Sequence, residues 1–300
     1  MTGNNQENIW LESTQQFRLE DYQPRELHPT VLPTEEAVGQ AMLEELEKTA
    51  SEKEGYINIA LLGGRGGQAL HRLLGERAKQ GDPGGLIARL NVFTQDALAP
   101  MEMGSTLSFV RDFERLLGSA FFERVHRFVP MHTDNPDLLA ALKEFTREFE
   151  ELGGLDIFFL GHGPEPGDNS HLAYIRSGSG AKVNSVTGLI PISPLVLEHH
   201  ITKFKAGGMP VSEKDEAETR AATHIMTLGP AAILGSRKLV QSVVDASTAP
   251  AKKVTFPKAL ETKFSPDLTE RATQLDQNPG LWVRLHSNVK SFILPDVLGA

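Results

Sequence analysis

The sequence predicts an α/β fold, with a mostly parallel β-sheet and helices on both faces in a three-layer, Rossmann-like arrangement. Short apolar runs alternate along the chain with segments of helical periodicity, which is the pattern of repeated strand–helix units. The runs at 57–62 (INIALL) and 155–160 (LDIFFL) are almost continuously apolar, as expected for strands that are buried on both faces. Several runs end at glycine or polar residues just before the next helical segment, so the connecting loops gather at one edge of the sheet.

The strands and helices of this alternation can be located by residue number. The predicted strands are the apolar runs at 57–62, 90–93, 127–130, 155–160, 223–228 and 239–244. The predicted helices begin at Thr34, Gln68, Leu107, Asn135 and Pro230. Thr34 and Asn135 suit helix caps, because their side chains accept hydrogen bonds from free N–H groups of the first turn. The segment 281–294 holds two apolar stretches around His286, and 249–277 is too polar to be assigned.

The domain organisation follows from the same pattern. Residues 1–30 are polar and contain Pro24 and Pro29, so they are predicted to form an irregular N-terminal lead-in. Residues 31–300 are predicted to form a single α/β domain. A chain of 300 residues is long enough for one large or two average domains, and the lack of an internal repeat favours one.

The composition excludes several kinds of site and partner. The chain has no cysteine, which excludes disulfides, thiolate zinc sites, iron–sulfur clusters and cysteine nucleophiles. A net charge of −9, with acidic and basic residues mixed along the chain, argues against a nucleic-acid or anionic-membrane partner. No run approaches the ~18 apolar residues of a membrane span, and the polar N-terminus lacks the pattern of a signal peptide. We therefore expect a cytoplasmic protein, and the sequence leaves a homo-oligomer open.

The first candidate site loop is the glycine turn at residues 63–67 (GGRGG), between a predicted strand and a helix. Glycines allow close approach of the backbone to a ligand, and free N–H groups at a helix start favour anions. Arg65 adds a charged fork suited to phosphate or carboxylate. The spacing is neither the dinucleotide fingerprint nor a P-loop, and such turns are often purely structural.

Two further loops carry titratable groups after predicted strands. Asp96 follows the strand at 90–93, where a single aspartate is more often a cap or turn residue. The loop at 161–180 follows the strongest strand signal and contains His162, Glu165, Asp168 and His171 among five glycines. Structural loops rarely concentrate titratable groups so densely, so this loop favours a functional interpretation.

The order of these loops resembles the glucosamine-6-phosphate deaminase and 6-phosphogluconolactonase superfamily. Its members carry a glycine-rich phosphate loop after the first strand, a strand that ends in Asp-Glu, and a GxGxDGH loop. The segment HLAYIRSGS at 171–179 is similar to HIAFNEPGS of the deaminases. The segments IMTLG at 225–229 and LHSNV at 285–289 also resemble deaminase motifs, and the whole resemblance spans residues 35–295.

The resemblance implies a role for each residue at a matching position. Asp96 stands where the family has its proton-shuttling aspartate, and His171 where it has the histidine that opens the sugar ring. The phosphate would lie on the glycine turn, formed by Gly63, Gly64, Arg65, Gly66 and Gly67. The remaining implied site residues are Asp168 and Asn169 beside the histidine, and Gly161, Gly163 and Arg176 for the substrate. The family chemistry implies no metal and no cofactor.

The implied partner is a small-molecule sugar phosphate. The resemblance implies an isomerase or deaminase for glucosamine 6-phosphate or a related hexose phosphate, with ring opening by the histidine and proton transfer by Asp96. Two alternatives stay open: a 6-phosphogluconolactonase-like ester hydrolase, in which His171 activates water, and a sugar-phosphate-binding protein without turnover.

The chain also departs from the family pattern. Asn169 replaces an aspartate, and Arg176 replaces the glutamate that supports the histidine, which would lower the pKa of His171. Members of the family also carry a lysine near their last strands, and its position corresponds here to Lys252 or Lys253. The adjacent pair His199-His200 is predicted to be a solvated pair and not a metal site.

Overall fold

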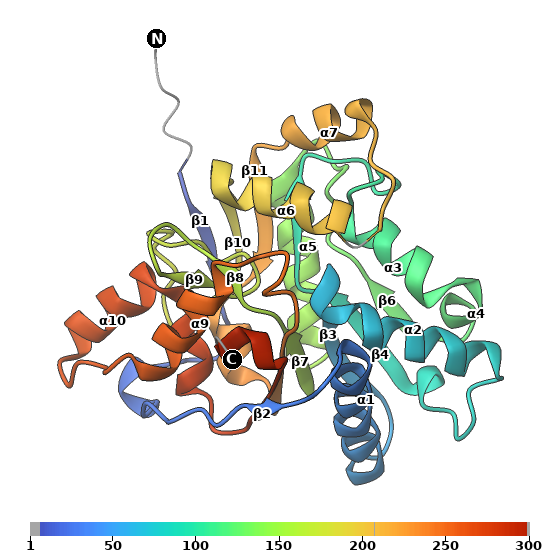
Figure 1. Ribbon diagram of the computed structural model, residues 1–300, viewed down its shortest axis with the longest axis horizontal. Coiled ribbons are helices and arrows are strands. Elements are labelled where there is room, and N and C mark those ends of the chain that lie inside the picture. The colour runs from blue at the N-terminus through green and yellow to red at the C-terminus, as the bar shows by residue number, and fades with distance from the viewer. Residues whose placement is uncertain (1–6, 207, 299–300) are drawn as a thin grey trace.

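A computed structural model describes residues 7–206 and 208–298 and contains a central seven-stranded sheet (Figure 1). The strand order is β2-β13-β12-β7-β3-β4-β6, and each neighbouring pair is parallel. In chain order these strands are β2 (Thr30–Val31), β3 (Ile57–Leu61), β4 (Leu90–Thr94), β6 (Arg127–Val129), β7 (Ile157–Leu160), β12 (Lys238–Val243) and β13 (Val289–Ile293). The predicted α/β class with a mostly parallel sheet is confirmed.

The central strands are buried on both faces, which explains their continuously apolar sequences. In β3, Ile59 and Leu61 enter one hydrophobic core, whereas Ala60 between them enters the other. In β7, Phe159 belongs to the first core and Phe158 to the second. Side chains alternate between the faces of a strand, so each face needs its own cover.

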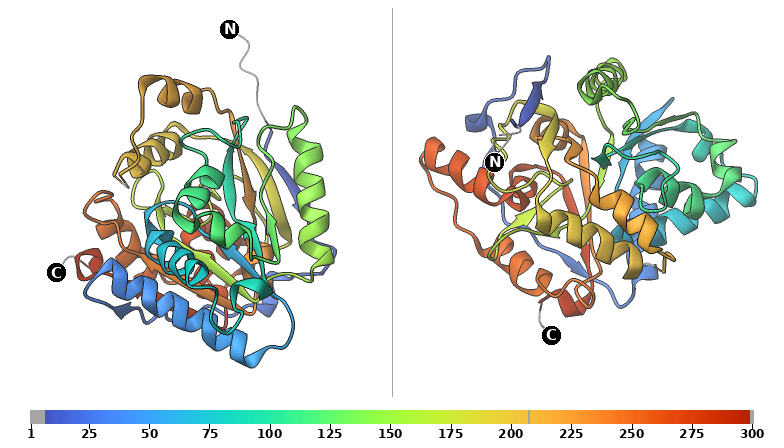
Figure 2. Two further views of the ribbon diagram at one scale, coloured as in Figure 1. Left: turned by 90° about the vertical axis from the view of Figure 1, so that its right-hand side faces the viewer. Right: turned by 90° about the horizontal axis from the view of Figure 1, so that it is seen from above.

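Helices cover both faces of the sheet. Helices α1 (Glu35–Glu52) and α2 (Arg65–Lys79) pack on one face, and α5 (Leu138–Glu151) and α8 (Pro230–Gly235) on the other (Figure 2). Thr34 caps α1 as predicted, because its side chain accepts a hydrogen bond from the N–H of Ala37 (3.1 Å). The cap of α5 is Asp137 and not Asn135: Asp137 accepts from the N–H of Ala140 (2.9 Å), while Asn135 accepts from Asp137 (2.8 Å).

Shorter elements surround these layers. The other helices are α3 (Phe109–Leu117), α4 (Ser119–Phe122), α6 (Pro194–Ala206), α7 (Glu213–Arg220), α9 (Lys252–Glu261) and α10 (Leu268–Gln277). The 3-10 helices are η1 (Leu19–Asp21), η2 (Ile87–Arg89), η3 (Pro279–Leu285) and η4 (Pro295–Leu298). Residues 249–277 thus contain two helices that their polar sequence did not reveal. No helix in the described part of the chain is long and apolar enough to cross a membrane.

A second, antiparallel sheet has the order β1-β10-β11-β5, which the sequence did not predict. Its strands are β1 (Ile9–Glu12), β5 (Asp96–Ala99), β10 (Ser185–Pro191) and β11 (His224–Leu228). The lead-in predicted to be irregular therefore contributes a strand. Trp10 of β1 fixes this strand: its ring lies where a Cβ of Gly188 would come within 2.5 Å, and its Nε1 donates to the backbone oxygen of Ser179 (2.9 Å).

The two sheets meet at Gln95, which lies between β4 and β5 and whose backbone oxygen accepts from the N–H of Leu228 (2.8 Å). The carboxyl ends of parallel strands share one edge of a sheet, so the segments after β3, β4, β7 and β12 converge there. Asp96 starts β5 directly at this edge.

We predict that Trp10→Ala destabilises the protein by about 3 kcal/mol, the lower end for removal of a large aromatic side chain, because Trp10 is only half-buried. Denaturant unfolding followed by circular dichroism measures the loss. Tyr56→Ala, at a residue that is 52% exposed, is the control and should change the free energy of unfolding by less than about 0.5 kcal/mol. Equal losses in both variants would contradict a structural role for β1.

Candidate active site

The converging loops surround a cleft of about 460 Å³. Eight residues implied by the sequence resemblance line it: Gly63, Arg65, Gly66, Asp96, Gly161, Gly163, His171 and Lys252. Polar residues outside that set also line the cleft, among them His162, Tyr174, His199, Lys203 and Asp245. Gly64 and Gly67 belong to the glycine turn but do not line the cleft.

His171 is held by a short antiparallel ladder between β8 (Gly163–Pro164) and β9 (Ser170–His171). Its ladder partner is Gly163, and a Cβ there would lie 1.9 Å from Nε2 of His171. Only glycine therefore leaves room for the imidazole. Asn278 fixes the neighbouring Ser170 by accepting from its N–H and its hydroxyl (2.8 Å each).

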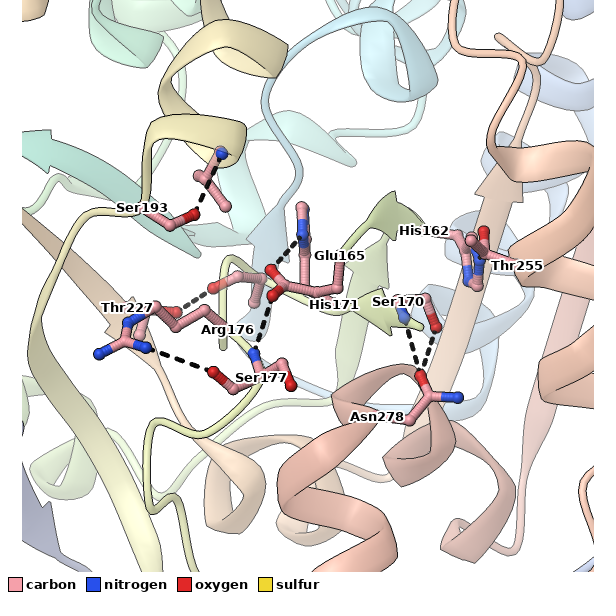
Figure 3. A network of polar contacts seen from close by, with 12 residues as sticks. His162, Glu165, Ser170, His171, Arg176, Ser177, Ser193, Thr227, Thr255 and Asn278 are labelled. Carbon is pink, nitrogen blue, oxygen red and sulfur yellow. Dashed lines mark hydrogen bonds and ion pairs between the residues drawn. The ribbon is translucent and has the colours of Figure 1, made fainter. Parts of the chain in front are cut away.

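Glu165 is the carboxylate partner of His171 (Figure 3). Its Oε1 lies 3.2 Å from Nδ1 of His171, and its Oε2 accepts from the N–H of Ser177 (3.0 Å). Because a carboxylate accepts, Nδ1 carries the proton and the neutral ring presents its lone pair at Nε2. Burial lowers the pKa of His171, and Glu165 opposes this effect. The expectation that Arg176 leaves His171 without a negative partner is corrected, since the carboxylate comes from an earlier turn of the same loop.

Arg176 itself points away from the cleft (Figure 3). Its guanidinium donates to the backbone oxygen of Pro191 (3.0 Å) and to Oδ1 of Asn8 (3.0 Å). These bonds tie the loop to the end of β10 and to the N-terminal segment. The structure does not bring this side chain to the position expected for a substrate ligand.

Asp168 and Asn169 also lie outside the cleft. The Asp168 side chain is 52% exposed and pairs with Lys258. The backbone oxygen of Asn169 accepts from the N–H of Glu165 (2.9 Å), which closes the turn that presents Glu165 to His171. Neither residue is placed where the expected catalytic carboxylate would act.

Asp96 and Lys203 form the second polar group of the cleft. Asp96 is 4% exposed, and its Oδ1 has no hydrogen-bond partner among the described residues. Burial raises the pKa of Asp96 to about 7, and the charge of Lys203 opposes the rise. Burial likewise lowers the pKa of Lys203 to about 8, and Asp96 opposes the fall. The Lys203 ammonium also lies over the rings of Phe109 (4.6 Å) and Tyr174 (4.5 Å), which stabilise a cation.

Helix α6 delivers Lys203 and His199 to the cleft from one face, since they are four residues apart. His200 anchors the helix: its Nε2 donates to the backbone oxygen of Leu107 (2.7 Å), and its Nδ1 accepts from the hydroxyl of Tyr174 (2.9 Å). The pair at 199–200 is therefore not solvated as predicted, because His200 is 1% exposed and His199 faces the cleft. The spacing of four residues between His199 and Lys203 was the sequence signal that both side chains lie on one face of α6.

The glycine turn begins helix α2, with Gly64 as N-cap at φ +74°, a left-handed conformation that favours glycine. Arg65 is already engaged: its guanidinium contacts Glu35 (2.6 Å) and the hydroxyl of Thr248 (3.3 Å). The backbone N–H groups at this helix start, together with Lys203, provide the donors for an anion. Within residues 7–206 and 208–298, no group of three histidine or acidic side chains is arranged to hold a metal ion.

Comparison of the whole structure with solved structures identifies the same fold in two groups of sugar-phosphate enzymes. A monomeric glucosamine-6-phosphate deaminase superposes with a TM-score of 0.70, at 17% sequence identity, over 91% of this chain and 99% of that protein. The 6-phosphogluconolactonase from Trypanosoma brucei gives a TM-score of 0.63 at 16% identity, over 93% of this chain and 98% of that one. The enzyme from Trypanosoma cruzi gives 0.61 at 13% identity, over 93% and 97%.

The sequence matches no protein-family model, and no curated protein sequence matches it significantly. The comparison of structures, and not of sequences, therefore confirms at the level of the fold the resemblance that the motifs indicate.

We predict that Glu165→Gln lowers the pKa of His171 further, because the substitution removes the negative charge that favours the imidazolium. The ring resonances of His171, assigned with a His171→Asn variant, report this pKa in an NMR titration. Asp168→Asn removes the same charge from the outside of the loop and is the matched control. An unchanged pKa in Glu165→Gln, or an equal shift in the control, would show that Glu165 does not act on His171.

Proposed function

We propose that this chain, which has the fold of glucosamine-6-phosphate deaminases and 6-phosphogluconolactonases, is an enzyme that acts on a phosphorylated sugar by acid/base chemistry. One observation supports this most: His171 and Asp96 line one cleft together with the glycine turn and two lysines. Such chemistry needs an imidazole, a carboxylate and backbone N–H groups that can bind the phosphate.

The phosphate would bind at the start of α2. Backbone N–H groups and the helix dipole favour an anion there, and the α2 helix is 15 residues long. Lys203 lies across the turn, since a Cβ on Gly64 would be 3.1 Å from its side chain. Arg65 contributes less than its sequence position implies, because Glu35 already neutralises it.

The reaction that uses both titratable groups is aldose–ketose isomerisation, with or without loss of an amino group. Nε2 of His171 would take the proton of the C1 hydroxyl and pass it to the ring oxygen, which opens the ring. Asp96 would then remove a proton from C2 and return it to C1, while a second proton moves from the oxygen or nitrogen on C2 to the oxygen on C1. With glucosamine 6-phosphate, water replaces the nitrogen at C2 and ammonia leaves, so the products are a ketose phosphate and ammonia.

Lactone hydrolysis is the second candidate, favoured by the exclusion of Asp168 and Asn169 from the cleft. His171 alone could activate a water molecule, whose oxygen would attack the lactone carbonyl. The ester C–O bond breaks, the ring oxygen takes the proton, and a sugar acid forms. Lys252 lines the same cleft and would stabilise the negative charge on the carbonyl oxygen.

Turnover distinguishes the candidates. We expect ammonia release from glucosamine 6-phosphate, and a loss of about 10²–10⁴-fold in kcat for His171→Gln, the usual contribution of an acid/base group. Asp96→Asn should abolish isomerisation but would leave lactone hydrolysis largely intact. His28→Gln, at an imidazole that is 85% exposed, is the control. Acid release from 6-phosphogluconolactone without ammonia release would select the hydrolase, and a thermal shift without turnover would select a binding protein.

The pH dependence tests the role of the Asp96–Lys203 pair. Isomerisation needs Asp96 as carboxylate and Lys203 as ammonium, so kcat/KM should rise through about pH 7 and fall above about pH 8. The two limbs belong to the interacting pair. Lys203→Met removes the charge that lowers the pKa of Asp96, so the acidic limb should move to higher pH. A limb that moves to lower pH would contradict this assignment.

A further inference from the structure

A buried ion pair lies inside the cleft, and its acidic member, Asp245, has no role in the chemistry described above. Asp245 follows β12, Lys252 begins α9, and both side chains line the cleft. The two residues are 4% and 5% exposed, and Oδ1 of Asp245 contacts the ammonium of Lys252 directly. The backbone oxygen of Asp245 accepts from the N–H groups of Thr248 and Ala249, which fixes the turn between the two partners.

This turn lies against the glycine turn. The hydroxyl of Ser242 donates to the backbone oxygen of Gly66 (2.8 Å), and the guanidinium of Arg65 contacts Thr248 (3.3 Å). The carboxylate of Asp245 therefore stands beside the helix start at which a phosphate would bind. Glu35 raises the pKa of Arg65 and Asp245 adds to the rise, while burial lowers the pKa of Lys203 and Asp96 and Asp245 oppose the fall, so the charge of Asp245 acts on both cations.

We propose that Asp245 is an internal counter-ion of Lys252 that competes with the ligand's phosphate and so selects phosphate over weaker anions. The proposal rests on the proposed phosphate site and adds to it a residue that sets anion selectivity. It assigns to Asp245 an effect opposite to that of an ordinary binding residue, because its removal should strengthen binding.

The electrostatic reason is the exchange of partners. A buried ammonium without a counter-ion is strongly disfavoured, so Lys252 at this depth needs the carboxylate of Asp245 beside it. An anion can contact the ammonium of Lys252 in one of two ways. It either approaches the carboxylate of Asp245, which repels it, or displaces that carboxylate from the ammonium. A carboxylate on a ligand has the same charge as the Asp245 side chain, so it has no advantage over Asp245 as a partner of Lys252. A phosphate dianion carries more charge and three acceptor oxygens, so it can bind Lys252, Lys203 and the helix start together.

The other cations of the cleft are paired differently. The partner of Arg65 is Glu35, which does not line the cleft. Burial lowers the pKa of Lys203, and among the acidic residues Asp96 opposes the fall most, ahead of Asp245 and Asp112. Asp245 is thus the acidic residue that forms a direct ion pair with a lysine of the cleft.

The test is the affinity of Asp245→Asn for inorganic phosphate and for acetate, measured by calorimetry at constant pH and ionic strength. We expect phosphate to bind about tenfold more tightly than in the wild type, as relief of one like-charge contact allows. Acetate, which the wild type should not bind measurably, should bind the variant. Asp168→Asn breaks an exposed aspartate–lysine pair outside the cleft and should change neither affinity. Equal or weaker phosphate binding by Asp245→Asn would overturn the proposal.

A second experiment uses a Lys252→Met background. It distinguishes competition between Asp245 and phosphate from a role in which Asp245 merely orients Lys252. Lys252→Met leaves a bare carboxylate in the cleft, so phosphate affinity should fall, and Asp245→Asn added to it should restore part of the loss. If Asp245 merely orients Lys252, the second substitution would have no effect once the lysine is absent. This comparison also decides the matter if the single Asp245→Asn variant folds poorly.

Failure of the proposed function has a different signature. In that case neither the wild type nor any variant would bind inorganic phosphate or glucosamine 6-phosphate. Wild-type binding of phosphate that is not strengthened in Asp245→Asn would reject only the role of Asp245.

Discussion

Charge pairing among buried side chains of the cleft is the constraint on which the candidate site depends. An unpaired charge at this depth costs several kcal/mol, so each charged side chain has an opposite charge nearby. Lys203 lies near Asp96, Lys252 contacts Asp245, and Arg65 pairs with Glu35. The carboxylate of Glu165 accepts a hydrogen bond from the neutral ring of His171. Under the proposed function, a charged ligand would bind by exchanging partners with these side chains.

The support of His171 shows how one chemical requirement can be met from a different chain position. The deaminase pattern implies a carboxylate five residues after the histidine, where this chain has Arg176. The turn closed by Glu165 and Asn169 places a carboxylate on the same ring from six residues before it. A residue-by-residue transfer of roles misses this replacement, because the geometry of the loop and not its alignment decides which side chain meets Nδ1.

The fold was largely predictable, because strands buried on both faces leave continuous apolar runs such as 57–62 and 155–160. Strand β1 was not, since four residues with one tryptophan among polar neighbours carry no periodic signal. In the site, Asp96, His171 and the glycine turn could be found because they follow strong strand signals. Asp245 could not, since its importance comes from tertiary proximity to the glycine turn, and for Lys203 the only local signal was its spacing of four residues from His199.

The hydrogen bond from Trp10 to Ser179 joins residues that are 169 positions apart and closes the last part of the loop that bears His171. Closing a stretch of chain this long costs conformational entropy, which the buried contacts of the two sheets must offset. The end of the loop at 161–180 keeps its place only while β1 is docked, so a change in this distant strand can reach the surroundings of His171.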